Sequence, residues 1–307
     1  MNLSVSSVNP YLPPFPGKSS ISPVGGGGGG GGDGTPLPMA PHAGDSLLHC
    51  RVEGDCFGGC RTPPLVQHTT TRNMNPHLTE IAYILDRSGS MGLMQQAAIT
   101  GFNQFVNSQL DVPGEARLTL VQFDDCYEVH AQALPIEQVS QLDNLSYVPR
   151  GSTALLDAIG RTILETHARI QTLPADQQPA KVVIAVFTDG QENASRTHSA
   201  LQISEMIRIH REQHGWEFLF LAANQDAIAA AGKLNINVGN SGNVRFNEPS
   251  ILASSIAMSR KIRSMRMRSS NTMDERSVAD ENKTLDQMIR EEESRLPSEG
   301  ADADTDA

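Results

Sequence analysis

The chain has 307 residues, a formal net charge of −11 and an aromatic share of only 5%. Glycine and proline are concentrated near its ends, so the globular part must be smaller than the whole, within a length that allows one or two domains. No run of eighteen apolar residues occurs, which excludes a membrane-spanning segment on this pattern. The N-terminus lacks the basic region and apolar core of a secretory signal, so a cytoplasmic location is expected.

Residues 1–73 are predicted to be disordered. Prolines at positions 10, 13, 14 and 16 interrupt regular structure, and residues 25–32 are eight consecutive glycines with no side chains to pack. Met74 directly precedes the first predicted strand, and we interpret it as the natural start, with the preceding stretch a mis-assigned extension or a dispensable tail. Cys50, Cys56, Cys60 and His49 are potential zinc ligands, but C-x5-C-x3-C is wider than structural zinc sites usually have, and no zinc is expected there.

From residue 79 the sequence alternates between strand and helix patterns. Residues 80–85 form an apolar run that stops at Asp86, which is typical of a buried parallel strand. A helix is predicted over 94–106. Strands over 117–123 and 126–131 follow, joined by a tight turn into an antiparallel pair, with Cys126 as a small core residue. Helices over 156–170 and 200–210 flank a strand over 181–187, and Gly215 ends the second helix. A strand over 217–222, a short helix over 225–231, an edge strand over 236–238 and a helix over 252–265 complete the series.

This alternation predicts an α/β fold over residues 74–268. We expect a doubly wound, mostly parallel central sheet with one antiparallel edge strand and helices on both faces. Residues 181–187 (KVVIAVF) are the most apolar strand and should be central. Residues 269–307 are predicted to be a disordered acidic tail with at most a transient helix near 284–295. From Asp274 onwards that tail has twelve acidic and four basic residues, a net charge of −8.

Oxygen-bearing side chains follow two of these strands. Asp86, Ser88 and Ser90 form the pattern D-x-S-x-S at the end of the first strand, and Asp189 follows the central strand. A third loop brings Thr153 to the start of a helix. Ligands of α/β sheets bind beyond the carboxyl ends of strands, and two carboxylates placed there would repel each other without a cation. Hard oxygen ligands favour Mg²⁺, with Mn²⁺ or Ca²⁺ as alternatives, over Zn²⁺. The interpretation without a metal is that these residues only cap helices and close turns.

The set resembles the metal-ion-dependent adhesion site of von Willebrand factor type A (vWA) domains. Asp86, Ser88 and Ser90 match the first motif, Thr153 matches the single threonine, and Asp189 matches the aspartate of the T-D-G loop. The resemblance spans roughly residues 79–267, and the segments ILDRSGSM, GSTALLDAIGRTI and VFTDGQENAS also look like small bacterial and phage vWA proteins of unestablished role. It implies that an acidic side chain of a partner protein completes the metal shell. Some family members work beside AAA+ ATPases, so such a partner is one candidate.

An enzymatic function is not expected. Asp86 at a strand end is similar to the nucleophile of metal-dependent phosphatases, but Ser88 stands where those enzymes place a second aspartate. A Mg²⁺- or Mn²⁺-dependent phosphate-ester hydrolase is therefore kept as the alternative to a protein-binding module. His210 and His214 are spaced i, i+4, yet the zinc-protease glutamate is missing from the position after His210, and a surface helix end is favoured.

Two further patterns are ambiguous. Basic residues recur from Arg260 to Arg268, which could bind nucleic acid but is better interpreted as a helix end paired loosely with the acidic tail. A nucleic-acid partner is therefore not expected. Asp157 could orient Thr153 or a metal-bound water, or be a plain surface carboxylate.

Overall fold

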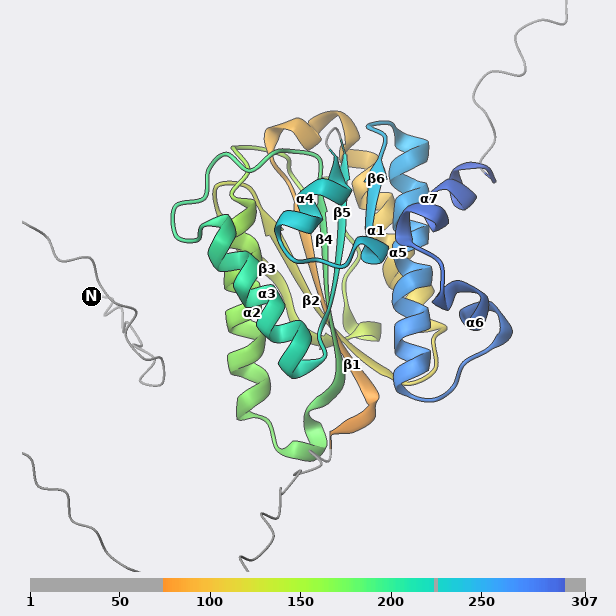
Figure 1. Ribbon diagram of the computed structural model, residues 1–307. Coiled ribbons are helices and arrows are strands. Elements are labelled where there is room, and N and C mark those ends of the chain that lie inside the picture. The colour runs from red at the N-terminus through yellow and green to blue at the C-terminus, as the bar shows by residue number, and fades with distance from the viewer. Residues whose placement is uncertain (1–73, 224–225, 296–307) are drawn as a thin grey trace, which may run out of the picture. The chain divides into compact units, whose positions relative to one another are not determined.

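The computed structural model describes residues 74–223 and 226–295 and centres on a six-stranded sheet (Figure 1). The strand order is β3-β2-β1-β4-β5-β6, and every neighbouring pair is parallel except β2–β3. The strands are β1 (Asn75–Asp86), β2 (Glu115–Phe123), β3 (Tyr127–Pro135), β4 (Pro179–Thr188), β5 (Glu217–Ala223) and β6 (Ser241–Val244). The predicted fold class is thus confirmed, including the antiparallel edge strand and the central place of residues 181–187.

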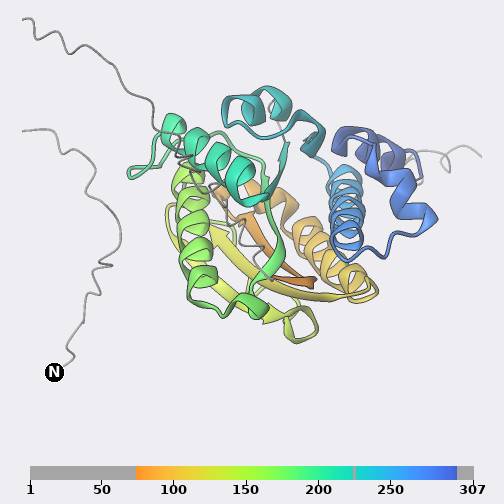
Figure 2. The ribbon, with the colours of Figure 1, turned by 60° about the horizontal axis from the view of Figure 1, so that its bottom comes forward.

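Helices cover both faces of the sheet (Figures 1 and 2). One face carries α2 (Leu155–Thr172), α3 (Ala200–His214) and α4 (Ala227–Lys233), and the other carries α1 (Gln95–Leu110) and α5 (Glu248–Ser269). Short 3₁₀ turns are η1 (Gly89–Met94), η2 (Ile136–Gln138), η3 (Ala175–Gln177) and η4 (Val238–Asn240). As predicted, α3 ends at Gly215, whose φ of 64° lies in the left-handed region that glycine adopts freely. None of the helices in the described ranges combines the length and apolar composition needed to cross a bilayer.

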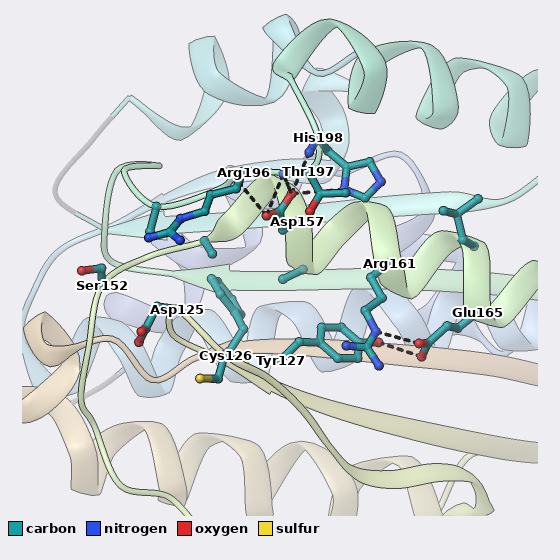
Figure 3. A pocket seen from close by; sticks show the side chains of 15 residues that line it. Asp125, Cys126, Tyr127, Ser152, Asp157, Arg161, Glu165, Arg196, Thr197 and His198 are labelled. Carbon is teal, nitrogen blue, oxygen red and sulfur yellow. Dashed lines mark hydrogen bonds and ion pairs between the residues drawn. The ribbon is translucent and has the colours of Figure 1, made fainter. Parts of the chain in front are cut away.

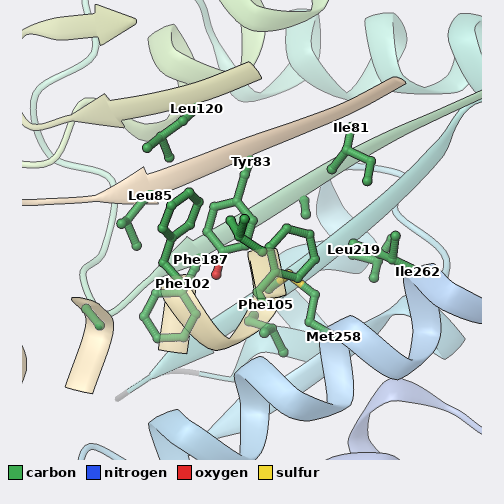
Figure 4. Close-up of a cluster of buried hydrophobic side chains, with 14 of the residues drawn as sticks. Ile81, Tyr83, Leu85, Phe102, Phe105, Leu120, Phe187, Leu219, Met258 and Ile262 are labelled. Carbon is green, nitrogen blue, oxygen red and sulfur yellow. The ribbon is translucent and has the colours of Figure 1, made fainter. Parts of the chain in front are cut away.

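The alternation of side chains along β1 divides the core into two layers. Ile81, Tyr83 and Leu85 point to the α1/α5 face, where the Tyr83 ring contacts Phe102 and Phe105 at centroid distances of 5.3 and 5.1 Å (Figure 4). The intervening Ala82 and Ile84 belong to the layer under α2 and α3. A strand buried on both faces reads as a continuous apolar run, which is the pattern seen in the sequence.

The last edge strand lies elsewhere than predicted. Residues 236–238 do not form a strand; Asn237 accepts a hydrogen bond from the backbone N–H of Gly239 at 2.9 Å and starts the 3₁₀ turn η4. The edge strand is β6, which starts five residues later than predicted and pairs with β5 from Ser241 to Val244. Its sequence, SGNV, has little strand propensity, so pairing with a neighbouring strand decides its conformation.

The expected disorder of the acidic tail is wrong for residues 269–295. Two helices form there, α6 (Glu275–Glu281) and α7 (Leu285–Glu293), the second begun by a capping box between Thr284 and Gln287. Leu285, Met288 and Ile289 are fully buried and join the core layer that contains α1 and α5. Three apolar residues at i, i+3 and i+4 are a short stripe, and only the presence of α5 and β6 gives it something to cover. Residues 1–73 and 296–307, for which disorder was also predicted, lie outside the described residues.

The basic residues of α5 pair with these added helices. Arg260, only 15% exposed in its side chain, forms ion pairs with Asp280, Glu291 and Glu292. Arg266 donates to the backbone carbonyl of Gln109 in the last turn of α1 at 2.8 Å and to that of Gly114, beyond the helix end, at 3.0 Å. The interpretation as a helix paired with acidic residues is therefore confirmed, although the pairing is buried rather than loose.

Candidate metal centre

The centre is built where the order of the strands reverses, between β1 and β4. Asp86 is the last residue of β1, and Asp189 directly follows β4. These strands are parallel neighbours with Leu85 opposite Phe187, so their carboxyl ends meet at one edge of the sheet. Open α/β sheets bind ligands at this reversal point because the loops there diverge to opposite faces and leave room between them.

Hydrogen bonds join the first and third loops side chain to side chain. The Ser90 hydroxyl donates to Oδ1 of Asp189 at 2.9 Å, and the hydroxyl oxygens of Ser88 and Ser90 are 3.0 Å apart. Asp86 is held separately, since its Oδ1 accepts from the backbone N–H of Ser88 at 2.7 Å and its Oδ2 from the Thr188 hydroxyl at 2.5 Å. Four of the five predicted side chains are thus fixed beside one another.

Thr153 reaches the same place on the loop before α2. A methyl group placed on Gly190 would lie 2.9 Å from the Thr153 hydroxyl oxygen and 3.7 Å from that of Ser90, so the two hydroxyls flank this glycine. The Thr153 backbone N–H donates to Oδ1 of Asn193 at 2.9 Å, which ties the loop to the segment after β4. All five residues predicted from the sequence are therefore brought together, and a side chain at position 190 would force the Thr153 hydroxyl to shift.

The electrostatics of the site are those of anions held out of water. Asp86 is completely buried and Asp189 is 5% exposed. Burial raises the pKa of Asp86 to about 6, against the hydrogen bonds from Thr188 and Ser88, and the charge of Asp189 adds to the increase. Burial also raises the pKa of Asp189.

One oxygen of the site is left without a partner. Oδ2 of Asp189 is buried and makes no hydrogen bond, which is costly for a carboxylate unless another group satisfies it. The site thus offers two carboxylates and three hydroxyls, and one carboxylate oxygen has no partner. Such a set of oxygen ligands fits a hard divalent cation. Asp86, Ser88, Ser90, Thr153 and Asp189 would hold the ion directly or through water. A cation bound there would supply a positive charge to which an anionic oxygen of a ligand could bind.

Two arginines that the motif does not single out hold the loops in place. Arg87, between the first two motif residues, and Arg150 both donate from Nε to Oδ2 of the fully buried Asp124 at 3.0 Å. They also bind the two oxygens of Glu128, at 2.6 and 2.8 Å. The backbone N–H of Arg150 donates to the carbonyl of Arg87 at 2.7 Å. In the sequence, this bridge is indicated only by the two aspartates at positions 124–125, which lie in the predicted tight turn between the strands 117–123 and 126–131.

A second internal support comes from Tyr147. Its hydroxyl donates to the backbone carbonyl of Asp86 at 2.6 Å, and its side chain is completely buried. The side-chain amide of Gln95, at the start of α1, donates to the Tyr147 carbonyl at 2.8 Å. The long loop between β3 and α2 is thereby fastened to the end of β1, a contact that no local pattern predicts.

Cys126 was predicted to be a core residue, and this is wrong. The β2–β3 ladder begins with Phe123 opposite Tyr127, so Cys126 lies in the connecting turn and is exposed. Asp124, Asp125 and Cys126 place three potential ligand atoms close together. However, the Asp124 carboxylate is occupied by the two arginines and by the backbone N–H of Cys126, so this cluster closes a turn.

The Asp157 carboxylate supports the site indirectly, since its hydrogen bonds go to the segment 196–198 and not to Thr153. Its carboxylate accepts hydrogen bonds from the backbone N–H groups of Arg196 at 2.8 Å, Thr197 at 3.0 Å and His198 at 2.7 Å. Figure 3 shows these bonds in the wall of a cavity of about 740 Å³ that is lined by α2, the 194–198 segment and the turn between β2 and β3. Asp157 therefore anchors the loop that follows Asp189 to the first turn of α2.

Residues 80–252 match the family model of the von Willebrand factor type A domain. That match covers more than half of the chain and includes all five oxygen-bearing residues. A comparison with curated proteins gave no match.

Several solved structures are similar in fold at low identity. The chain is similar to von Willebrand factor type A from Catenulispora acidiphila, with 14% identity over 62% of this chain and 42% of that one and a TM-score of 0.40. It is similar to manganese-loaded TRAP protein of Plasmodium vivax, with 15% identity over 59% of this chain and 74% of that one and a TM-score of 0.39. It is also similar to proximal thread matrix protein 1 from the mussel byssus with a zinc-occupied MIDAS motif. The identity is 14% over 60% of this chain and 46% of that one, and the TM-score is 0.41. The chain spans less than half the length of the first and third of these proteins.

Proposed function

The chain belongs to the von Willebrand factor type A family, and we propose that it is a non-enzymatic, metal-dependent protein-binding module. In this proposal Asp86, Ser88, Ser90, Thr153 and Asp189 hold one divalent cation, and a Glu or Asp of a partner protein completes its coordination. The observation that carries the proposal is the buried Oδ2 of Asp189, which has no hydrogen-bond partner although Oδ1 accepts one from Ser90.

Mg²⁺ is the cation that this donor set favours, with Mn²⁺ and Ca²⁺ as alternatives. All five side chains offer oxygen, and Mg²⁺ is typically bound by one or two carboxylates with other positions left to water. A coordinated water is a position that an incoming carboxylate can take. The ion would also reduce the repulsion between Asp86 and Asp189, both of which have raised pKa values because they are buried.

The surroundings of the centre suit a protein ligand. Ser90 is exposed, so the set opens to solvent on one side. Leu93 is 79% exposed three residues after it, and Leu145 is 89% exposed on the loop that Tyr147 fastens to Asp86. Exposed leucines on both segments would add apolar contact around one charged contact, which is the arrangement of an interface with a central anchor.

The test is capture of partners by the purified full-length chain, compared in Mg²⁺ and in EDTA. Asp86→Ala should abolish capture, whereas Asp111→Asn, an exposed acid at the far end of α1, should leave it intact. A partner that qualifies must itself lose binding when one of its Glu or Asp residues is changed to the amide. Equal capture by the Asp86→Ala variant, or in EDTA, would contradict the mechanism.

The same preparations distinguish the alternative of a phosphate-ester hydrolase. Turnover of p-nitrophenyl phosphate in Mg²⁺ or Mn²⁺ that disappears with Asp86→Asn would favour the enzyme. The binding module predicts no turnover that depends on Asp86. Ser88 lies at the position where the corresponding phosphatases carry an acid, and a hydroxyl cannot supply a proton at neutral pH in that role.

A further inference from the structure

Three histidines gather at the edge of the sheet opposite the metal centre. His167 lies on α2, twelve residues or about 18 Å of helix beyond its start, and His210 and His214 lie one turn apart at the end of α3. Their ring centroids are separated by 5.0, 4.9 and 5.3 Å, and the Trp216 ring lies 4.5 Å from that of His210. Helices α2 and α3 run side by side (Figure 1), so residues far apart in sequence meet there.

The hydrogen bonds of His210 define its tautomer. Nδ1 lies 2.7 Å from the carbonyl oxygen of Met206, and because a carbonyl only accepts, Nδ1 carries the proton. In the neutral ring Nε2 then has a free lone pair. That nitrogen is buried without a hydrogen-bond partner, in a residue only 8% exposed. Burial lowers the pKa of His210 to about 4, so the ring is neutral at pH 7.

We propose that His167, His210 and His214 form a second metal site, which takes Zn²⁺ through one nitrogen of each imidazole. Neutral imidazole is a preferred ligand of zinc, and an N–H donated to a backbone carbonyl is the usual support of such a ligand. Zinc bound tetrahedrally at about 2.0 Å from each nitrogen would place the ring centroids about 5 Å apart, as they are here. His167 and His214 are half-buried, so an ion can reach the cluster from solvent.

Binding requires the two outer rings, His167 and His214, to rotate and to exchange present contacts for the ion. The rings pack edge to face, with 89° between the planes of His167 and His210, and their nitrogens do not yet converge on one point. Rotation of the two half-buried rings about their side-chain bonds would bring them together, while His210 stays fixed by Met206. Lys181 is a positive charge near the cluster, since its ammonium group donates to the Gly215 carbonyl at 3.2 Å. That charge is balanced by the carboxylate of Glu217 at 3.0 Å.

The experiment must separate this site from other zinc ligands in the chain. The full-length protein is prepared with Asp86→Ala and with all four cysteines changed to serine, which removes the oxygen site and every thiol. Zn²⁺ is then titrated by calorimetry and by its effect on the unfolding temperature. We expect binding of one ion and a rise in that temperature. His167→Gln and His214→Gln should each weaken zinc binding at least about tenfold, and His77→Gln, an exposed histidine outside the cluster, should not.

A spectroscopic measurement covers the case in which a variant is unstable. In the zinc-free protein the ring ¹⁵N resonances should show His210 protonated at Nδ1, and zinc should shift the Nε2 resonance of that ring. The proposal is overturned if His167→Gln, His214→Gln and His77→Gln bind zinc equally well. It is also overturned if the three rings give unchanged resonances in saturating zinc.

Discussion

The hydroxyl of Ser90 donates a 2.9 Å hydrogen bond to Oδ1 of Asp189, while Oδ2 of the same carboxylate is buried with no partner. The two residues are 99 positions apart and follow different strands of the sheet. One oxygen of Asp189 therefore holds the loops together, and the other has no hydrogen-bond partner.

Replacing Asp189 by asparagine should abolish stabilisation by metal without destabilising the metal-free protein. The amide removes a buried charge near Asp86, so metal-free stability should be equal or higher. In the wild type, Mg²⁺ or Mn²⁺ at a hundredfold excess over its Kd should add about 2.7 kcal/mol. Urea unfolding with and without the ion measures both effects. Ser152→Ala, at an exposed hydroxyl of the Thr153 loop, serves as control, and a variant still stabilised like wild type would exclude Asp189 as a ligand.

Asp124→Asn should destabilise the protein by about 3 kcal/mol, because it removes the buried anion of Arg87 and leaves that buried guanidinium paired only with the half-exposed Glu128. Glu128→Gln changes an acid that is 43% exposed and binds the same two arginines, and it should cost no more than about 1 kcal/mol. Chemical unfolding in the absence of metal gives both values. Similar losses for the two variants would mean that Asp124 is not the main anchor of these loops.

Met288→Ala in α7 should cost about 2 to 5 kcal/mol, since Met288 is completely buried in the layer shared with α1 and α5. Val278→Ala in α6 is the comparison, because that side chain is 52% exposed and should change stability by no more than about 0.5 kcal/mol. Thermal unfolding of the full chain is sufficient. If Met288→Ala is silent, α7 does not belong to the folded domain.

Stability of the metal-free protein should fall as the pH drops from 7 to 4, in part because of His210. Burial holds the pKa of this ring at about 4, against 6.5 ordinarily, with smaller decreases from His167 and His214. Between these values the unfolded chain binds more protons than the folded one, so acid favours unfolding, by up to about 3 kcal/mol at pH 4. His210→Gln should remove this share of the pH dependence. Parallel pH profiles for variant and wild type would show that His210 is not titrating in that range.

Most strands of the sheet and most of the centre follow from local patterns. The run at 80–85 ending in Asp86 and the run at 181–187 before Asp189 identify buried parallel strands, and carboxylates after such strands must lie at one edge of the sheet. Ser88 and Ser90 share a tight loop with Asp86, so their nearness is also local. These features can be predicted from the sequence because the apolar pattern of a strand and the position of its end depend only on neighbouring residues.

Other features depended on contacts between distant segments. The Arg87–Asp124–Arg150 bridge, the Tyr147 bond to the Asp86 carbonyl and the meeting of His167 with His210 join residues on separate elements. The acidic composition of residues 269–295 predicts disorder. Helix α7 nevertheless forms, because α5 and β6 provide a surface that its three apolar side chains cover. Sequence alone predicted which oxygen-bearing side chains meet at one edge of the sheet. Tertiary packing decided what holds them still, because burial and ion pairing are properties of the assembled core.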